Sequence, residues 1–231
     1  MAKSDTKQKK NYTRRTIEDF SEGKYKFQLF GRLVTVKTLF RLFYKIEFVG
    51  QEKIPKSGKF IIAPNHTSLC DPFISGEFMD MPIAYMGKKE LFENPILAYL
   101  LDWLACFAVN REKLEVSTMK TAIDICKTEK WHLGIFPQGE RVRNKKLENI
   151  NKGFAVLAKQ MKVNIVPMAI TGLETSNHNP FNRKPVKVEL GDVISYDQSY
   201  DEIIDEWCTK IAKMTGYEYV KSQEEVPAEV K

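Results

Sequence analysis

The sequence is poor in residues that bind metals or form disulfides. Its 231 residues include four cysteines and three histidines, and no two cysteines form a Cys-x-x-Cys pair. Isolated cysteines of this kind fit a reducing compartment, because small secreted domains use closely spaced cysteines as a disulfide framework. We therefore expect no zinc or iron site.

Long apolar segments are also missing. Charged residues interrupt every segment well before the ~20 apolar residues that a membrane-spanning helix needs. The first twenty residues are polar and lack the apolar centre of a signal peptide. We expect a protein that is not secreted, and that lies in the cytoplasm or on the cytoplasmic face of a membrane as a peripheral or monotopic protein.

The charge is unevenly distributed. Residues 1–59 contain 15 Lys and Arg against 6 Asp and Glu, a net charge of +9, whereas the remaining residues carry a net charge of −3. A basic end on a near-neutral body favours an anionic partner, either a membrane or a nucleic acid. No nucleic-acid recognition motif accompanies the basic end, so we expect an anionic membrane surface and no nucleic acid.

Four parts can be distinguished along the chain. Residues 1–24 are predicted to be a basic flexible tail, and residues 216–231 a loose C-terminal tail. Residues 25–44 are predicted to form an amphipathic helix, with an apolar stripe of Leu29, Leu33, Val36, Phe40 and Phe43 beside a basic stripe of Lys37, Arg41 and Lys45. Such a helix lies either in an anionic membrane interface or on the protein core, and its phenylalanines and basic charge favour membrane docking.

Residues 45–215 are predicted to form one α/β domain. Apolar segments typical of strands occur at 45–54, 60–63, 81–86, 106–109, 132–136, 163–170 and 186–190. They alternate with helical segments at 73–79, 94–104, 114–129, 153–161 and 199–214. This alternation predicts a largely parallel, mixed sheet flanked by helices.

The segment Asn-His-Thr-Ser-Leu-Cys-Asp-Pro at 65–72 follows the strand predicted at 60–63. His66 and Asp71 are five positions apart, an offset of about 140° on a continuous helix, where their side chains could not meet. Pro72 favours a turn between them, because proline suits the first turn of a helix and the residue before it avoids the helical region. With that turn the two side chains can form an acid–base pair. The alternative is a histidine that only satisfies a local hydrogen bond.

Two more loops at predicted strand ends carry polar residues. Asn110 and Arg111 follow the strand at 106–109, and Gly139 and Arg141 follow the strand at 132–136. Ligands of open α/β sheets bind at the carboxyl ends of the strands. The guanidinium of arginine suits bidentate hydrogen bonding to a phosphate, and a glycine lets the backbone approach an anion closely. The alternative for each arginine is a surface ion pair.

Taken together, these motifs make the sequence resemble the glycerolipid acyltransferase family typified by the 1-acylglycerol-3-phosphate acyltransferases. The family's His-x4-Asp signature matches at 65–72, and three further blocks follow in the family's order, at Ala105 to Arg111, Phe136 to Arg141 and Ile165 to Ala169. Lys88 fits the lysine of the family's Lys-x-Glu-Leu segment. The resemblance covers about residues 44–195, and four blocks in order are far more specific than any one of them.

The resemblance implies transfer of a fatty acyl chain from a thioester, either acyl-CoA or acyl-carrier protein, to the free hydroxyl of a lysophospholipid such as 1-acylglycerol 3-phosphate. It implies no separate cofactor. His66 would be the general base and Asp71 would orient it. Further members of the implied substrate site are Lys88, Asn110, Arg111, Gln138, Gly139, Glu140 and Arg141. The sequence contains no Gly-x-Ser-x-Gly elbow, which agrees with a reaction without a serine acyl-enzyme.

Two departures from the family pattern leave the acceptor open. Gln138 stands where the family has glutamate, and Glu140 stands where it has threonine. Glycerol 3-phosphate or a different lysolipid is therefore an alternative acceptor. A catalytically silent lipid-binding protein and a hydrolase are the remaining alternatives.

Overall fold

A seven-stranded sheet forms the centre of the molecule. The computed structural model describes residues 11–110, 115–174 and 181–221. The strands are β1 (Tyr44–Val49), β2 (Phe60–Pro64), β3 (Ile83–Lys88), β4 (Phe107–Val109), β5 (His132–Gly134), β7 (Asn164–Thr171) and β8 (Lys184–Leu190). Their order is β1-β8-β7-β2-β5-β3-β4, and every neighbouring pair is parallel except the antiparallel β7 and β8. The predicted largely parallel, mixed sheet is confirmed.

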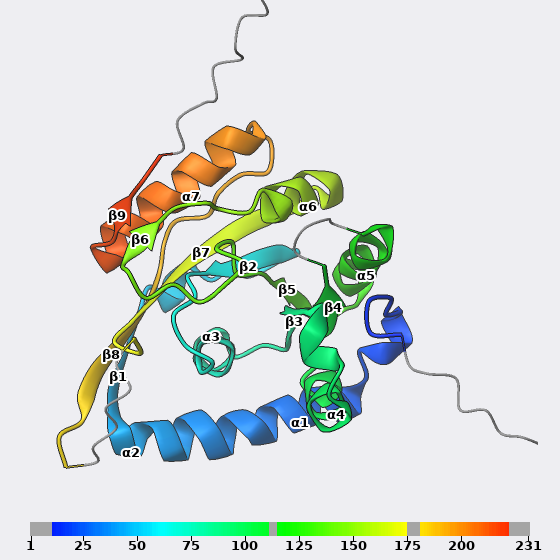
Figure 1. Ribbon diagram of the computed structural model, residues 1–231, viewed down its shortest axis with the longest axis horizontal. Helices are drawn as coiled ribbons and strands as arrows, with labels where there is room; N and C mark the ends of the chain where they lie inside the picture. The colour runs from blue at the N-terminus through cyan, green and yellow to red at the C-terminus, as the bar shows by residue number, and fades with distance from the viewer. Residues whose placement is uncertain (1–10, 111–114, 175–180, 222–231) are drawn as a thin grey trace, which may run out of the picture.

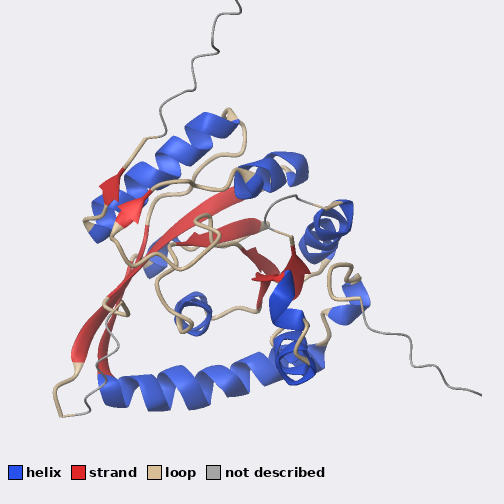
Figure 2. Cartoon of the chain, viewed as in Figure 1, coloured by secondary structure: helices blue, strands red, loops and turns tan. Residues whose placement is uncertain are grey.

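Helices cover both faces of this sheet (Figures 1 and 2). On one side lie α5 (Val116–Lys127), α6 (Gly153–Met161) and α7 (Tyr200–Thr215). On the other lie α3 (Asp71–Met79) and the N-terminal helix made of α1 (Glu22–Arg32), η2 (Leu33–Phe40) and α2 (Arg41–Phe43), with α4 (Pro95–Trp103) beside it. Each face has its own apolar core, because β2 alternates Ile61 and Ile62 between the two core clusters.

Helix ends follow the local sequence. Ser199 and Glu202 form a capping box at the start of α7, and Gly216 ends that helix with a φ of 73°. The side chain of Asn94 caps α4 by accepting from the backbone N–H groups of Ile96 and Leu97. Short single turns, η1 (Ile17–Asp19), η3 (Gln51–Lys53) and η4 (Lys89–Phe92), complete the connections.

The predicted helix at 25–44 exists, but its apolar stripe is not one surface. Val36 is fully buried in the core, and Phe40 and Phe43 pack against the same cluster. The exposed apolar residues of the helix lie on its other side and are Leu29, Phe30, Leu33, Val34, Leu39 and Leu42. The predicted stripe combines residues of two opposite faces, because this helix is apolar both toward the core and toward the solvent.

Residues 11–24 differ from the flexible tail that the sequence predicts. Arg15 is only 2% exposed, and its guanidinium forms ion pairs with Asp102 and Asp19. The carbonyl of Tyr12 accepts a hydrogen bond from the backbone N–H of Ala108 in β4 at 2.8 Å, which ties the segment to the edge of the sheet. A buried arginine needs paired carboxylates, and Asp102 on α4 supplies one that no local sequence pattern reveals.

Residues 216–221 are likewise built into the fold rather than loose. β9 (Glu218–Tyr219) pairs in parallel with β6 (Lys146–Leu147), which is distant in sequence, and the two strands form a second small sheet. The strands are only two residues long, too short to give an alternating pattern, and therefore the sequence does not predict them. Within the described residues, no helix is long and apolar enough to cross a membrane.

Candidate active site

The candidate site lies where four neighbouring strands end. His66 follows β2, Lys88 ends β3, Asn110 follows β4 and Gly139 follows β5, and these strands are adjacent in the order β2-β5-β3-β4. All four residues line one chamber, as expected for the carboxyl edge of a parallel sheet. Arg111, predicted to bind substrate, lies outside the described residues.

His66 and Asp71 form the pair that the sequence predicts. The Nδ1 atom of His66 is 2.9 Å from Oδ2 of Asp71, which is fully buried as the first residue of α3. The same Oδ2 accepts the backbone N–H groups of Thr67 at 2.7 Å and Ser68 at 2.8 Å. A carboxylate can only accept, so this contact assigns the ring proton to Nδ1 and leaves the Nε2 lone pair available as a base.

An aromatic stack supports the imidazole. The ring of His66 stacks on Phe136, with centroids 4.0 Å apart, and Phe136 stacks on Tyr85 at 5.3 Å. The Tyr85 hydroxyl contacts the Ser75 hydroxyl, and burial raises the pKa of Tyr85 well above its usual range. Phe136 begins the family block at 136–141, whereas Tyr85 looks like any apolar strand residue in the sequence.

Gln138 contacts the backbone of the candidate base. Its Oε1 atom accepts the backbone N–H of His66 at 2.7 Å, and the backbone N–H of Val142 donates to the His66 carbonyl at 2.9 Å. Gln138 is 6% exposed and is not among the residues that line the chamber. The loop after β5 therefore fixes the backbone of His66 from both its donor and its acceptor side.

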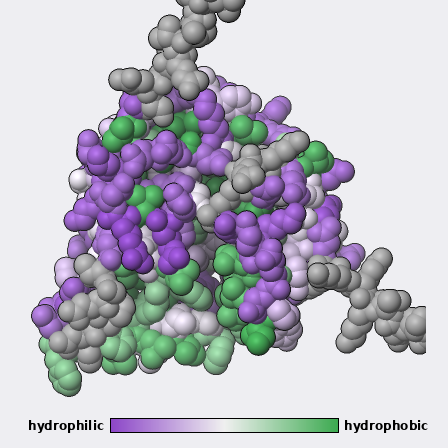
Figure 3. Space-filling view, viewed as in Figure 1, coloured by the Kyte–Doolittle hydropathy of each residue, from purple (hydrophilic) through white to green (hydrophobic). Residues whose placement is uncertain are grey.

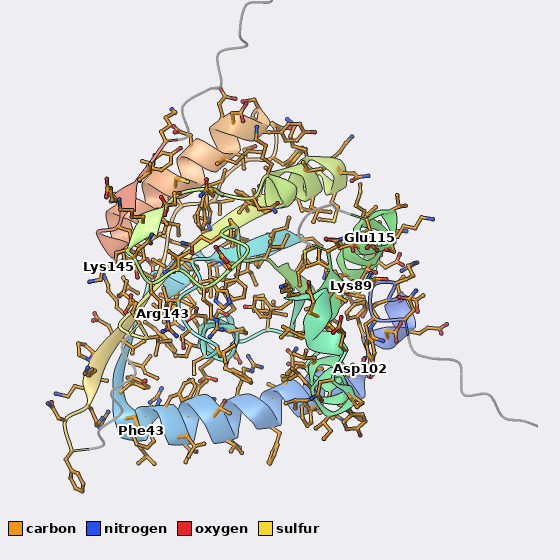
Figure 4. All side chains as sticks on the ribbon, in the orientation of Figure 1. Phe43, Lys89, Asp102, Glu115, Arg143 and Lys145 are labelled. Carbon is orange, nitrogen blue, oxygen red and sulfur yellow. The ribbon has the colours of Figure 1, made fainter. Side chains whose placement is uncertain are left out.

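Of the basic side chains near the chamber, which we call the cationic rim, Lys88 lines it, and Arg141 and Arg143 lie on the loop that follows the lining residue Gly139. The Lys88 side chain is 48% exposed and lies 3.4 Å from Glu90, a solvated pair that holds the ammonium weakly. Glu140 and Arg141 are exposed, and Arg143 and Lys145 follow on the segment that leads to β6 (Figure 4). In the described parts of the chain, Arg141 and Arg143 have no salt-bridge partner. Both guanidiniums are therefore available to an anion.

The chamber itself is apolar. Its volume is about 680 Å³, within the range of about 300–1,000 Å³ that is usual for small-molecule sites. Leucines of η4, of α4 and of the residue that follows α4 line its wall, at Leu91, Leu97, Leu100, Leu101 and Leu104. His66 and Phe136 line the same space, so a hydrocarbon chain held there lies next to the imidazole. Over the described residues, no group of three His, Cys, Asp or Glu is placed to hold a metal ion.

Comparison with known proteins agrees with this geometry. A family model described as Acyltransferase matches residues 45–171, more than half of the chain, and this segment contains both His66 and Asp71. The chain belongs to the acyltransferase family. The predicted resemblance is therefore confirmed, and the protein is an O-acyltransferase.

Named relatives point the same way. The acyltransferase is 27% identical over 217 residues to the 1-acyl-sn-glycerol-3-phosphate acyltransferase of Streptococcus pneumoniae. This alignment covers 93% of this chain and 78% of the relative. It is 30% identical over 158 residues to the Bacillus subtilis enzyme of the same name, which covers 68% and 77% of the two chains. The crystal structure of the 1-acyl-sn-glycerophosphate acyltransferase from Thermotoga maritima matches with a TM-score of 0.62 at 21% identity, over 82% of this chain and 86% of that one. This last likeness shows the shared fold.

Proposed function

We propose that this acyltransferase moves a fatty acyl chain from a thioester to the free hydroxyl of 1-acylglycerol 3-phosphate, giving phosphatidate. The observation that carries the proposal is the position of His66, whose paired imidazole lines an apolar chamber together with the half-exposed Lys88. The names of the relatives support the same acceptor. The thioester is either acyl-CoA or acyl-carrier protein.

His66 acts as the general base in this reaction. Its Nε2 takes the proton of the acceptor hydroxyl while the hydroxyl oxygen attacks the thioester carbonyl carbon. The tetrahedral intermediate collapses, the carbon–sulfur bond breaks, and the imidazolium returns the proton to the leaving thiolate. Asp71 holds the ring in the required tautomer and stabilises the imidazolium between these steps.

The acceptor phosphate binds at the cationic rim. Lys88 and Arg141 supply charge, and Asn110 and Gly139 line the adjoining part of the chamber. Arg111 is proposed as a third cation from its place in the family motif. Glu140 brings a negative charge beside Arg141, and this observation favours a second candidate acceptor with a less highly charged headgroup, a lysolipid other than 1-acylglycerol 3-phosphate.

The enzyme docks on an anionic membrane through an apolar face. That face joins the exposed apolar side of the N-terminal helix, including Phe30, Leu33 and Leu42, to Ile96 and Tyr99 of α4. The two helices pack together through Phe27 and Trp103, whose ring centroids are 5.6 Å apart. In Figure 3 apolar side chains gather along the lower edge of the view, over these same elements. Contiguous exposed apolar surface of this kind marks an interaction site.

An acyl-transfer assay tests the proposal. Purified protein is mixed with vesicles that contain 1-acylglycerol 3-phosphate and is offered acyl-CoA and acyl-carrier protein thioesters separately. We expect phosphatidate from the wild type and none above background from His66→Ala, with both proteins showing the same thermal unfolding. Product formation by His66→Ala would overturn the role of the base, and product only with another lysolipid would select the second candidate acceptor.

A further inference from the structure

The proposed base lies at one end of an aromatic stack whose other end is bonded to α3. Tyr85, on β3, is 6% exposed and stacks on Phe136, which in turn stacks on His66. The Tyr85 hydroxyl contacts the hydroxyl of Ser75, which is fully buried on α3. The same helix begins with Asp71, the hydrogen-bond partner of the imidazole. The two members of the pair are therefore joined a second time, through the rings and the helix.

The contact between the two hydroxyls has a defined direction. Oγ of Ser75 lies 2.8 Å from the carbonyl oxygen of Asp71 and 3.1 Å from that of Pro72. Because a carbonyl can only accept, the single proton of Ser75 goes to one of these oxygens, and Oγ accepts the proton of Tyr85. Burial raises the pKa of the Tyr85 hydroxyl, which keeps it protonated and able to donate. The phenol thus donates to the first turns of α3.

The neighbouring strand leaves room for the tyrosine ring. Tyr85 is the partner of Gly134 in the ladder between β3 and β5, and a Cβ added to Gly134 would lie 2.3 Å from a ring carbon of Tyr85. Atoms do not pack so closely, so any larger residue at position 134 would displace the ring. The ring is therefore confined by the backbone of β5, by Phe136 and by the bond to Ser75.

Filling the core does not by itself require the hydroxyl. A phenylalanine would occupy the same space on β3, and a phenol is costly to bury unless its hydroxyl is bonded. The bond to Ser75 instead restrains the tilt of the Tyr85 ring. Neighbouring ring planes in the stack are 20° and 24° apart, so a change in the tilt of one ring is resisted by the next. The restraint thus extends from the phenol to the imidazole.

We propose that Tyr85 is a positioning residue for the acyl transfer, which acts through Phe136 to hold the plane of the His66 imidazole. This inference rests on the proposed function, in which His66 is the base. The bond to Asp71 fixes one ring nitrogen but permits rotation of the ring about that bond, whereas the stack fixes the plane. Both restraints are needed to keep Nε2 directed at one point of the chamber. Because proton transfer depends steeply on alignment, a small tilt of the ring lowers the rate.

Steady-state kinetics of Tyr85→Phe test the proposal, because this variant keeps the ring and loses only the hydroxyl. We expect kcat to fall about three- to tenfold, the rate equivalent of one lost hydrogen bond. The KM values for the thioester and for the acceptor should each stay within twofold of the wild type. A merely structural role of the hydroxyl would lower the unfolding temperature and leave the kcat of the folded enzyme unchanged.

Ser75→Ala completes a double-variant cycle. Alone it leaves the buried phenol without its acceptor, so we expect a larger loss of kcat than in Tyr85→Phe. Adding Tyr85→Phe removes the unpaired phenol, and the double variant should therefore have a higher kcat than Ser75→Ala. Thr128→Val is the matched control. It removes a buried hydroxyl that donates to the Ile125 carbonyl at 2.7 Å, on the segment between α5 and β5, and should keep the wild-type kcat.

The outcomes separate the two proposals. A kcat of Tyr85→Phe within twofold of the wild type would overturn the role of Tyr85, as would losses that multiply in the double variant. Absence of transfer from every thioester by the wild type would overturn the proposed function instead. Thermal unfolding of each variant is measured first, and if Ser75→Ala does not fold, the comparison of Tyr85→Phe with Thr128→Val decides.

Discussion

The carboxylate of the proposed acid–base pair accepts three hydrogen bonds on one oxygen. Oδ2 of Asp71 accepts from the His66 ring and from the backbone of Thr67 and Ser68. The two backbone donors hold the carboxylate in place before the imidazole becomes charged. The aspartate also begins α3, so its carboxylate lies at the positive end of the helix dipole. The pair is therefore preorganised for proton transfer.

Replacing Asp71 with asparagine separates geometry from charge. The amide oxygen can keep the place of Oδ2, because the backbone N–H groups of Thr67 and Ser68 need an acceptor there, so the ring tautomer is kept and only the charge that stabilises the imidazolium is lost. We expect kcat to fall by about 10- to 100-fold, since a hydrogen bond to a charged group is worth about 1.5–3 kcal/mol. Steady-state kinetics with the lysolipid acceptor measure this, and an unchanged kcat would contradict the stabilising role of the charge.

Among single residues, the sequence predicts the pairing of His66 with Asp71 better than it predicts the residues that hold this pair in place. His66 and Asp71 could be paired because Pro72 signals the turn between them, and the turn is present. Tyr85 could not be found, because it resembles any apolar strand residue and acts only through contacts between distant segments. Gln138 was predicted beside the acceptor phosphate, yet its observed contact is to the backbone of His66.

Among the elements, β6 and β9 link the C-terminal segment to the loop after β5. Glu218 donates its backbone N–H to the Lys145 carbonyl and Val220 donates to the Leu147 carbonyl, both at 3.0 Å. The loop that carries Arg141 ends in β6, and therefore its exit is fixed by residues more than seventy positions later. The C-terminal segment thus helps to position the cationic rim.

Glu218→Pro should loosen that rim. Proline removes the donor to Lys145, a bond worth about 1 kcal/mol, and we expect the KM for the acceptor to rise about three- to tenfold with a smaller change in kcat. The matched control is Glu218→Ala, which keeps the N–H and loses only the exposed ion pair with Lys146. Equal KM values for the two variants would show that β9 does not act on the acceptor site.

Most elements could be predicted from periodicity alone, because apolar strands and amphipathic helices alternate along the chain. The segments that could not be predicted are those whose stability depends on partners distant in sequence. The segment around Arg15 depends on Asp102, and β9 depends on β6, and neither dependence leaves a local pattern. The N-terminal helix is predicted correctly, but because two of its faces are apolar, the sequence does not show which of them packs on the core.

For the whole molecule, the apolar face defines the proposed membrane-binding side. Leu33 and Leu42 are each 53% exposed, and glutamates at both positions would place charges where hydrocarbon is expected. We expect Leu33→Glu/Leu42→Glu to bind anionic phospholipid vesicles more weakly by tenfold or more, since burying one leucine is worth about 1.5–3 kcal/mol. Sedimentation with vesicles measures the partitioning.

A matched variant controls for the added charge. Val193 is 37% exposed on the segment between β8 and α7, outside the apolar face, and Val193→Glu should leave vesicle binding nearly unchanged. If the double variant partitions like Val193→Glu, the apolar face does not dock on the membrane. Unfolding temperatures close to that of the wild type would confirm that the comparison reports the surface.

The N-terminal helix has a consequence for how substrate is supplied. One side of it, through Gln28 and Arg32, is a wall of the chamber, and the other is the proposed membrane-facing side. A lipid can then pass from bilayer to enzyme without crossing bulk water, and its supply becomes a two-dimensional process. The governing variable is the mole fraction of lysolipid in the bilayer, so inert phospholipid added at a fixed bulk lysolipid concentration should slow turnover by surface dilution.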